Sequence, residues 1–193
     1  MPTAALLLAG GMSTRMGTDK ASLPFQGRRL VEVIADRLRA LKGVDAVFVS
    51  GVIEGLPSIP DEQPARGPLE GVRSVISETI KRGEHFARFL IVPVDMPNLS
   101  SEHLENLLAT PAGEAQAVHF SGFELPLLLT HSHEVMRQLS ELCSDSIPAN
   151  KRSFRQLLAG LESVAIPPNR PAAALARSFM NTNTPEEWER AIL

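Results

Sequence analysis

The sequence is poor in cysteine and has no excess of positive charge. Its single cysteine, Cys143, excludes an internal disulfide framework and a zinc site built from cysteines. Nineteen Lys and Arg against 22 Asp and Glu give a net charge of −3, so no general field draws the chain to nucleic acid or to an anionic membrane. No apolar run is long enough to span a bilayer, and the N-terminus lacks the basic region of a signal peptide. We therefore expect a cytoplasmic protein that binds neither nucleic acid nor membrane and holds any anionic ligand through local groups.

Length and composition predict one globular domain that spans residues 1–193. Of these residues, 44% are hydrophobic and 21% are charged, which is close to the average of folded domains and excludes disorder as the dominant state. A chain of this length buries roughly two-thirds of the surface that its unfolded form exposes. It therefore needs no disulfide bond to stabilise its core.

Short apolar runs alternate with stretches of helical periodicity. Four runs have the pattern of buried strands, at residues 4–9, 46–50, 88–94 and 163–166. Between them, apolar residues recur every three or four positions, which predicts helices near residues 30–41, 69–80, 101–108 and 132–142. The alternation is typical of β-α-β units and predicts an α/β fold with a mostly parallel sheet. Gly43 and Gly83 stand where they would end the first two helices.

Two local patterns add to this outline. Residues 116–120 and 124–130 flank a Ser-Gly-Phe turn and predict a hairpin-like antiparallel pair, in which Pro126 suits an edge strand. Near the C-terminus, Thr184-Pro185-Glu186-Glu187 is a capping box with proline at the first helical position. It predicts a short helix that carries Trp188.

The first apolar run leads into Gly10-Gly11 and then into a hydroxyl-rich loop with Arg15 and Lys20. Ligands of open α/β sheets bind beyond the carboxyl ends of the strands, where this loop is expected. Glycines let backbone N–H groups approach a phosphate closely, and the two cations can neutralise its charge. An ordinary turn with two solvated cations is the alternative. The spacing fits neither a Walker A motif nor G-x-G-x-x-G, which disfavours kinase-type and dinucleotide redox functions.

Other polar residues are candidates for the same site. Asp95 follows the third apolar run, so it is expected at the same sheet edge, where one carboxylate beside bound phosphates suits Mg²⁺; the alternative is a cap on the next turn. Asp61 lies in a polar turn, either solvated or in contact with a ligand. Asn181 and Asn183 precede the capping box and either bind a ligand or satisfy loop backbone.

Three further features carry less weight. His131 and His133 lie two apart, but no matching Cys/His set accompanies them, so we expect no structural metal site. We expect a buried, inert thiol at Cys143. The basic segment 151–155 predicts a solvated helix face.

The pattern L-A-G-G-x-S-x-R-M-G-x-D-K-A-x-L-P-x-x-G at residues 8–27 resembles the signature of the molybdenum cofactor guanylyltransferases, a family of MobA-like NTP transferases. The Asp19-Lys20 pair is closer to that family than to the sister cytidylyltransferases, in which we expect Pro-Lys. Further motifs of the family follow in order along nearly the whole chain: Asp61, Gly67-Pro68-Leu69-x-Gly71, Pro93-Val94-Asp95-Met96-Pro97 and Asn181-Thr182-Asn183-Thr184-Pro185. Several ordered motifs are far more specific than one loop.

The resemblance implies a three-layer, Rossmann-like nucleotidyltransferase fold, mostly parallel with a short antiparallel element. It implies transfer of GMP from GTP to the phosphate of molybdopterin, with release of pyrophosphate and formation of molybdopterin guanine dinucleotide. Mg²⁺ would be the cofactor, held by Asp95. The catalytic residues it implies are Arg15, Lys20 and Asp95, and the nucleotide-binding residues are Leu8, Ala9, Gly10, Gly11, Lys20, Asp61 and Asp95.

The chain also departs from the family pattern. Ser50 stands where the family can present an asparagine for nucleotide contact. In this family, a basic stretch near residues 151–155 could receive the phosphate of the pterin substrate. Alternative functions are a transferase that uses CTP or a sugar phosphate, and a nucleotide-binding regulator without turnover. The resemblance leaves room for transient contact with proteins that mature molybdoenzymes.

Overall fold

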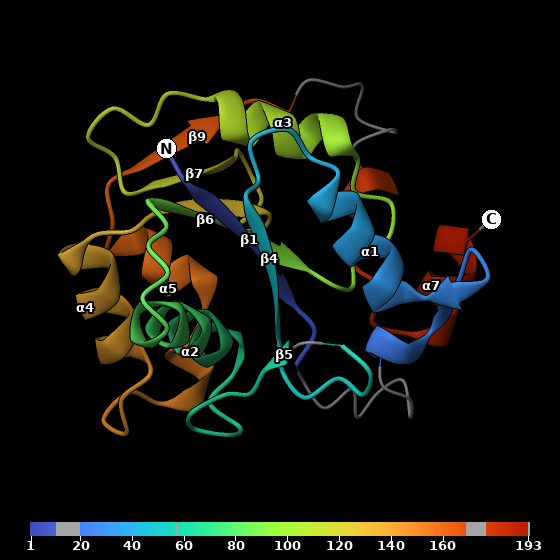
Figure 1. Cartoon of the computed structure of the whole chain (residues 1–193), viewed down its shortest axis with the longest axis horizontal. Helices are drawn as coiled ribbons and strands as arrows, with labels where there is room; N and C mark the ends of the chain where they lie inside the picture. Colours follow the sequence, from blue (N-terminus) through green and yellow to red (C-terminus); the bar gives the residue numbers. More distant parts are fainter. Residues whose placement is uncertain (11–19, 57, 169–176, 193) are drawn as a thin grey trace.

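A computed structural model describes residues 1–10, 20–56, 58–168 and 177–192. Within these residues, seven strands form the main sheet, in the order β5-β4-β1-β6-β8-β7-β9. Strand β8 pairs antiparallel with β6 and β7, and the other pairings in this sheet are parallel. The strands, shown in Figure 1, are β1 Thr3–Leu8, β4 Ala46–Ser50, β5 Ser58–Ile59, β6 Arg88–Pro93, β7 Ala117–Phe120, β8 Leu127–Thr130 and β9 Ser163–Ile166.

The sheet confirms the predicted mostly parallel arrangement and the antiparallel pair. The expectation of an edge strand at Pro126 is wrong, because β8 lies inside the sheet between β6 and β7. Pro126 directly precedes the first residue of β8. The missing N–H of proline therefore removes no hydrogen bond from the ladder.

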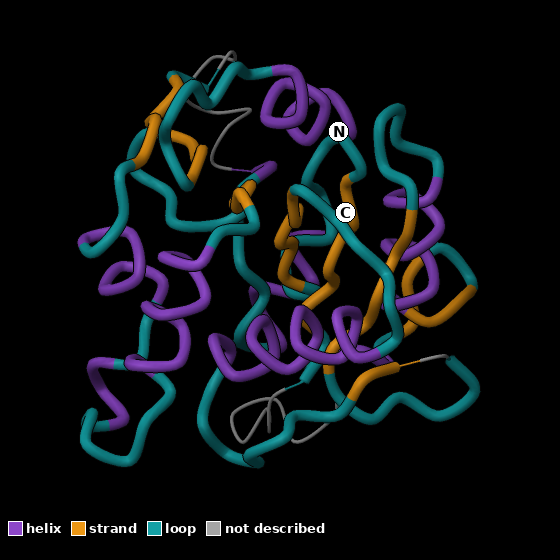
Figure 2. The backbone as a smooth tube through the Cα atoms, turned by 60° about the vertical axis from the view of Figure 1, so that its left-hand side comes forward, coloured by secondary structure: helices purple, strands orange, loops and turns teal. Residues whose placement is uncertain are grey.

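Helices cover both faces of the sheet (Figure 1), and the tube view shows the strands in the middle with helices around them (Figure 2). Alternate residues of β1 point to opposite faces: Ala5 and Leu7 belong to one core cluster, and Ala4, Leu6 and Leu8 to the other. The first cluster is covered by α1 Leu30–Arg39, α3 Ser101–Ala109 and α7 Pro185–Ile192, and the second by α2 Pro68–Lys81, α4 His133–Leu142 and α5 Phe154–Ala159. This is the predicted three-layer architecture.

Helix ends follow their sequence signals in α2 but not in α1. Gly83 has a φ of +74° and donates to the carbonyl of Ile80, while Glu84 donates to Thr79, the pair of bonds that defines a Schellman motif. The prediction that Gly43 ends the first helix is wrong. Helix α1 ends at Arg39, and Gly43, with a φ of +92°, lies in the turn that follows.

Smaller elements complete the described part of the chain. The short helix η1 Lys20–Ser22 leads into a second sheet, the antiparallel pair β2 Pro24–Phe25 and β3 Arg28–Arg29, and η2 Ala149–Lys151 precedes α5. Among the described residues, no helix has both the length and the apolar character that a membrane span requires.

Leu7, at 0% exposure in the centre of the sheet, gives a test of the core. We expect Leu7→Ala to lower the free energy of unfolding by about 2–5 kcal/mol, because the truncation removes buried contacts and leaves a cavity. Val52→Ala is the matched control, since Val52 is 84% exposed and its truncation should change stability by less than about 0.5 kcal/mol. Urea unfolding curves measure both, and equal midpoints for the two variants would contradict the assignment of Leu7 to the core.

Candidate functional site

The register of the central strands brings three strand ends to one edge of the sheet. Leu8, the last residue of β1, pairs with Ser50 on one side and with Pro93 on the other, and these residues end β4 and β6. Ala9 and Asp95 therefore leave the sheet at the same edge. This edge carries the carboxyl ends of parallel strands, where α/β proteins bind their ligands.

Two glycines allow the ends of β1 and β4 to lie very close together. Gly51 has a φ of +108°, and a Cβ atom there would lie 2.9 Å from Gly10 Cα and 3.0 Å from Gly10 N. A side chain at position 51 would therefore clash with backbone and adopt a strained conformation. Sequence reasoning missed Gly51, although its place directly after a predicted strand was a usable signal.

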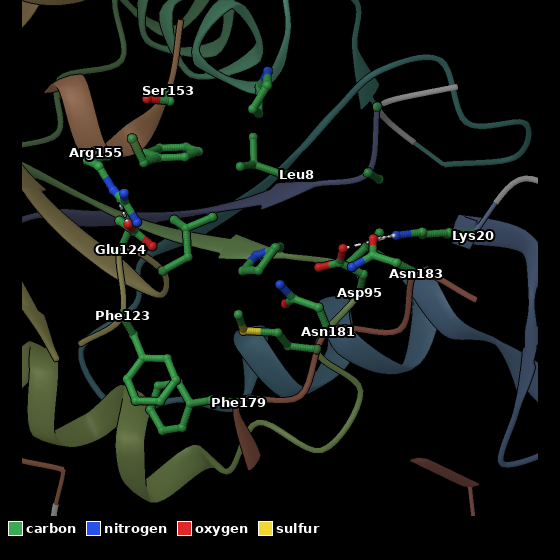
Figure 3. A pocket seen from close by; sticks show the side chains of 18 of the residues that line it. Leu8, Lys20, Asp95, Phe123, Glu124, Ser153, Arg155, Phe179, Asn181 and Asn183 are labelled. Atoms are coloured by element: carbon green, nitrogen blue, oxygen red, sulfur yellow. Dashed lines mark hydrogen bonds and ion pairs between the residues drawn. The ribbon is translucent and has the colours of Figure 1, made fainter. Parts of the chain in front are cut away.

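Lys20, Asp95 and Asn183 form a polar cluster at this edge. The Lys20 ammonium donates to Asp95 Oδ2 at 3.0 Å and to Asn183 Oδ1 at 2.6 Å (Figure 3). The side chains of Lys20 and Asp95 are 15% and 22% exposed, so the pair is largely screened from solvent yet reachable from one side. The structure thus joins three residues that lie up to 163 positions apart in the chain.

A cavity of about 990 Å³ opens beside this cluster. At one end, Lys20, Asp95 and Asn183 lie next to the backbone that leaves β1; at the other, Arg155 Nε donates to Glu124 Oε1 at 3.1 Å (Figure 3). The wall includes a stacked pair of rings, Phe123 and Phe179, with centroids 4.2 Å apart and planes 28° apart. The cavity therefore has charged groups at both ends and an aromatic surface.

Several of the residues singled out in the sequence meet at this cavity. Its lining includes Leu8, Ala9, Gly10, Lys20, Asp95, Asn181 and Asn183. Gly11 and Arg15 lie outside the described residues. Of the basic segment 151–155, Arg155 and Ser153 reach the cavity, whereas Arg152 binds the carbonyls of Ile147 and Ser144. The segment is therefore not only a solvated helix face.

Asp61 and Ser50 lie beside α2 and are not among the residues that line the cavity. Ser50 is 2% exposed, and Gly71 leaves room for it, because a Cβ on Gly71 would lie 2.4 Å from Ser50 Oγ and 3.4 Å from Asp61 Oδ1. Asp61 Oδ1 is buried and has no hydrogen-bond partner among the described residues. Burial raises the pKa of the Asp61 carboxyl, and the nearby charge of Glu70 raises it further.

Cys143 meets the expectation of a buried, inert thiol. Cys143 is buried, and burial raises the pKa of its thiol to about 12, so the thiolate is scarce at neutral pH. No group of three potential metal ligands of the His, Cys, Asp or Glu type occurs in the part of the chain that the structure describes.

Sequence reasoning missed the aromatic wall of the cavity. Phe123 and Phe179 are separated by more than 50 residues, and neither lies in a motif of known spacing. Phe123 belongs to the turn between β7 and β8, and Phe179 lies a few residues before α7. Only the folded chain brings these two rings together.

Known proteins resemble this chain over nearly its whole length. The family model of the MobA-like NTP transferase domain matches residues 5–164. A molybdenum cofactor guanylyltransferase from Xanthomonas euvesicatoria is 37% identical over 191 residues, covering 99% of this chain and 95% of the relative, and one from Rhizobium meliloti is 31% identical, covering 97% and 89%.

A solved structure supports the fold independently. The molybdopterin-guanine dinucleotide biosynthesis protein A from Archaeoglobus fulgidus superposes with a TM-score of 0.71 at 20% identity, covering 98% of this chain and 96% of that structure. The family model and the near full-length relatives establish the wider assignment: this chain belongs to the MobA-like NTP transferase family and is a nucleotidyltransferase.

Proposed function

We propose that this protein transfers GMP from GTP to the terminal phosphate of molybdopterin, releasing pyrophosphate and forming molybdopterin guanine dinucleotide. The observation that carries the proposal is the meeting of Lys20 and Asp95 at one end of a cavity, beside the backbone that leaves β1. Relatives that match nearly the whole chain bear the name molybdenum cofactor guanylyltransferase, which supports the choice of nucleotide and acceptor.

The proposed reaction is a displacement at phosphorus. An oxygen of the molybdopterin phosphate attacks the α-phosphorus of GTP, and the bond from that phosphorus to the bridging oxygen of the β-phosphate breaks, so the electron pair leaves with pyrophosphate. The attacking phosphate is already largely ionised near neutral pH and needs no strong general base. Positioning two anions and neutralising their charge is the main task of the protein.

The residues at the edge of the sheet suit that task. Lys20 offers an ammonium to the phosphates, and the glycine-rich backbone after β1 lets them approach closely. We also assign Arg15 and Gly11 to phosphate binding, from their place in the same loop. At the other end, we assign the aromatic pair and Arg155 to the pterin substrate, because flat rings stack on Phe side chains and a guanidinium binds phosphate.

Mg²⁺ is part of the proposal, because the donor at Asp95 fits it. A carboxylate is the hard oxygen ligand that Mg²⁺ prefers, and this one already accommodates a cation, the Lys20 ammonium. One protein carboxylate is enough, since Mg²⁺ usually takes its other ligands from phosphates and water. The bound ion would supply charge neutralisation at the nucleotide phosphates.

One other function stays open as an alternative, and two more are disfavoured. A transferase that uses CTP or a sugar phosphate would bind its substrates at the same edge of the sheet. A nucleotide-binding regulator without turnover is disfavoured, because binding alone does not require a metal-holding carboxylate next to Lys20. A hydride-transferring enzyme is disfavoured by the absence of G-x-G-x-x-G after β1.

The choice of nucleotide is tested by turnover. Purified protein, Mg²⁺ and molybdopterin are incubated with GTP, CTP, ATP or UTP, and released pyrophosphate is measured. We expect pyrophosphate release with GTP to be at least tenfold faster than with the other nucleotides, because the binding site must distinguish guanine from the other bases. Release with CTP but not GTP would contradict the proposal.

Asp95→Ala tests the charged end of the cavity. We expect GMP transfer to fall by about 100-fold or more, because the variant loses an electrostatic group that acts on the transition state. Asp36→Ala is the control, since Asp36 lies on α1 away from the cavity and its loss should leave turnover unchanged. Unchanged turnover in Asp95→Ala, with a normal unfolding curve, would remove Asp95 from the mechanism.

Asp61→Asn tests whether the partly buried carboxylate of Asp61 contributes to nucleotide binding. A raised pKa in the folded state means that ionised Asp61 lowers stability, so stability is lost as the pH rises above the unfolded pKa of about 3.9. We expect Asp61→Asn to raise the free energy of unfolding at pH 7, to lose this gain near pH 3, and to weaken binding of GTP. Asp36→Asn is the matched control, because hydrogen bonds from Arg28 and Arg39 lower the pKa of Asp36. If Asp61→Asn binds GTP like the native protein, Asp61 has no role in nucleotide binding.

A further inference from the structure

The segment from Asn181 to the end of α7 links the two parts of the chain that supply Lys20 and Asp95. Thr182, which is fully buried, donates to the carbonyl of Asp95 from its backbone N–H at 2.9 Å and from its hydroxyl at 3.2 Å. Asn98, three residues after Asp95, donates from Nδ2 to the carbonyl of Ala191 at 2.9 Å. The C-terminal segment is therefore fixed at both of its ends to the loop that follows β6.

The same segment also packs against the chain that follows Lys20. The rings of Phe25 and Trp188 lie with centroids 6.0 Å apart, and the two residues are 7% and 8% exposed. Phe25 belongs to β2, which begins four residues after Lys20. Helix α7 is thus held between the Lys20 side and the Asp95 side of the cavity.

Within this segment, the capping box of α7 fixes the backbone of Asn183. Glu187 Oε2 accepts the N–H of Asn183 at 2.7 Å and the N–H of Thr184 at 3.0 Å, and the N–H of Glu187 donates to Thr184 Oγ1 at 3.2 Å. These bonds confirm the predicted capping box. They add a bond to Asn183 N–H, which a capping box does not require.

We propose that Asn183, held in place by Glu187, is a positioning residue for Lys20. The Lys20 ammonium has three N–H groups, and the described residues give acceptors to two of them, Asp95 Oδ2 and Asn183 Oδ1. The third N–H has no acceptor among the residues that the structure describes, and we assign it to a ligand phosphate. A lysine side chain loses much rotamer freedom when it is fixed, and a second, neutral acceptor keeps it fixed when the charge of Asp95 is drawn to another cation.

The positioning itself can be tested without any substrate. The chain has four lysines, Lys20, Lys42, Lys81 and Lys151, so mass spectrometry after brief treatment with acetic anhydride gives a separate rate of acetylation for each. In the native protein we expect Lys20 to react more slowly than Lys42. In Asn183→Ala, the loss of one acceptor should raise the rate at Lys20 about fivefold and leave Lys42 unchanged. Asn183→Asp keeps an acceptor oxygen and should keep Lys20 protected.

A matched control separates positioning from general loosening. Ser132 caps α4, far from Lys20 in the fold, and accepts the N–H of Val135 at 3.2 Å. Ser132→Ala should therefore lose a cap without changing the rate at Lys20. Equal Lys20 rates in the native protein and in Asn183→Ala, or a faster rate in Ser132→Ala as well, would overturn the proposal.

The claim that positioning of Lys20 assists GMP transfer rests on the proposed function, and measurements of turnover test it. We expect Asn183→Ala to lower kcat for GMP transfer about tenfold with less than a threefold change in KM for GTP, and Asn183→Asp to recover part of kcat. If the native protein transfers no GMP, the proposed function fails while the acetylation rates still decide whether Asn183 holds Lys20. Normal kcat in Asn183→Ala would show that the contact has no catalytic purpose.

Discussion

The alignment of β1 with β4 and β6 is the constraint on which the site depends. Because Leu8 lies opposite both Ser50 and Pro93, three strands end at the same level. A shift of one residue in either pairing would turn every side chain of the strand to the other face and separate the glycine backbone from Asp95. The buried side chains of β1 on both faces make such a shift costly, so the core on either side of the sheet also fixes the geometry of the edge.

The close approach of Gly10 and Gly51 follows from the same constraint. Strands pair at a fixed spacing along their length, but beyond their ends these two chains converge more closely because residue 51 carries no side chain. With a Cβ at residue 51 only 2.9 Å from Gly10 Cα, any other residue there would push the strand ends apart. The site is therefore built from backbone as much as from side chains, which suits a ligand rich in phosphate oxygens.

Periodicity and ordered motifs predict much of this molecule, and contacts across long stretches of chain explain what they miss. Alternating apolar runs predicted β1, β4, β6 and β9 and a mostly parallel sheet, because each element must bury one face, and the resemblance implied the three layers. Motif resemblance grouped Lys20 and Asp95, which the structure brings to 3.0 Å. By contrast, the stacking of Phe123 on Phe179 and the bond from Lys20 to Asn183 leave no local pattern in the sequence. The prediction for Pro126 was wrong because the sequence alone does not distinguish a proline just before an inner strand from a proline within an edge strand.

Each end of the cavity holds a cation next to a carboxylate. Under the proposed function, a chain of negative net charge must bind two anions there, and these ion pairs affect how it can do so. Lys20 is paired with Asp95, and Arg155 with Glu124. A phosphate that binds Lys20 in this arrangement lies close to the Asp95 carboxylate and is repelled by it, which weakens binding in a partly buried site. A second cation at Asp95 would remove that repulsion and would leave the ammonium to the phosphate. We infer that the nucleotide and a divalent cation bind together at this end. Arg155 is different, because its side chain is 81% exposed and water screens its pairing with Glu124, so an incoming phosphate can draw it away without a metal ion.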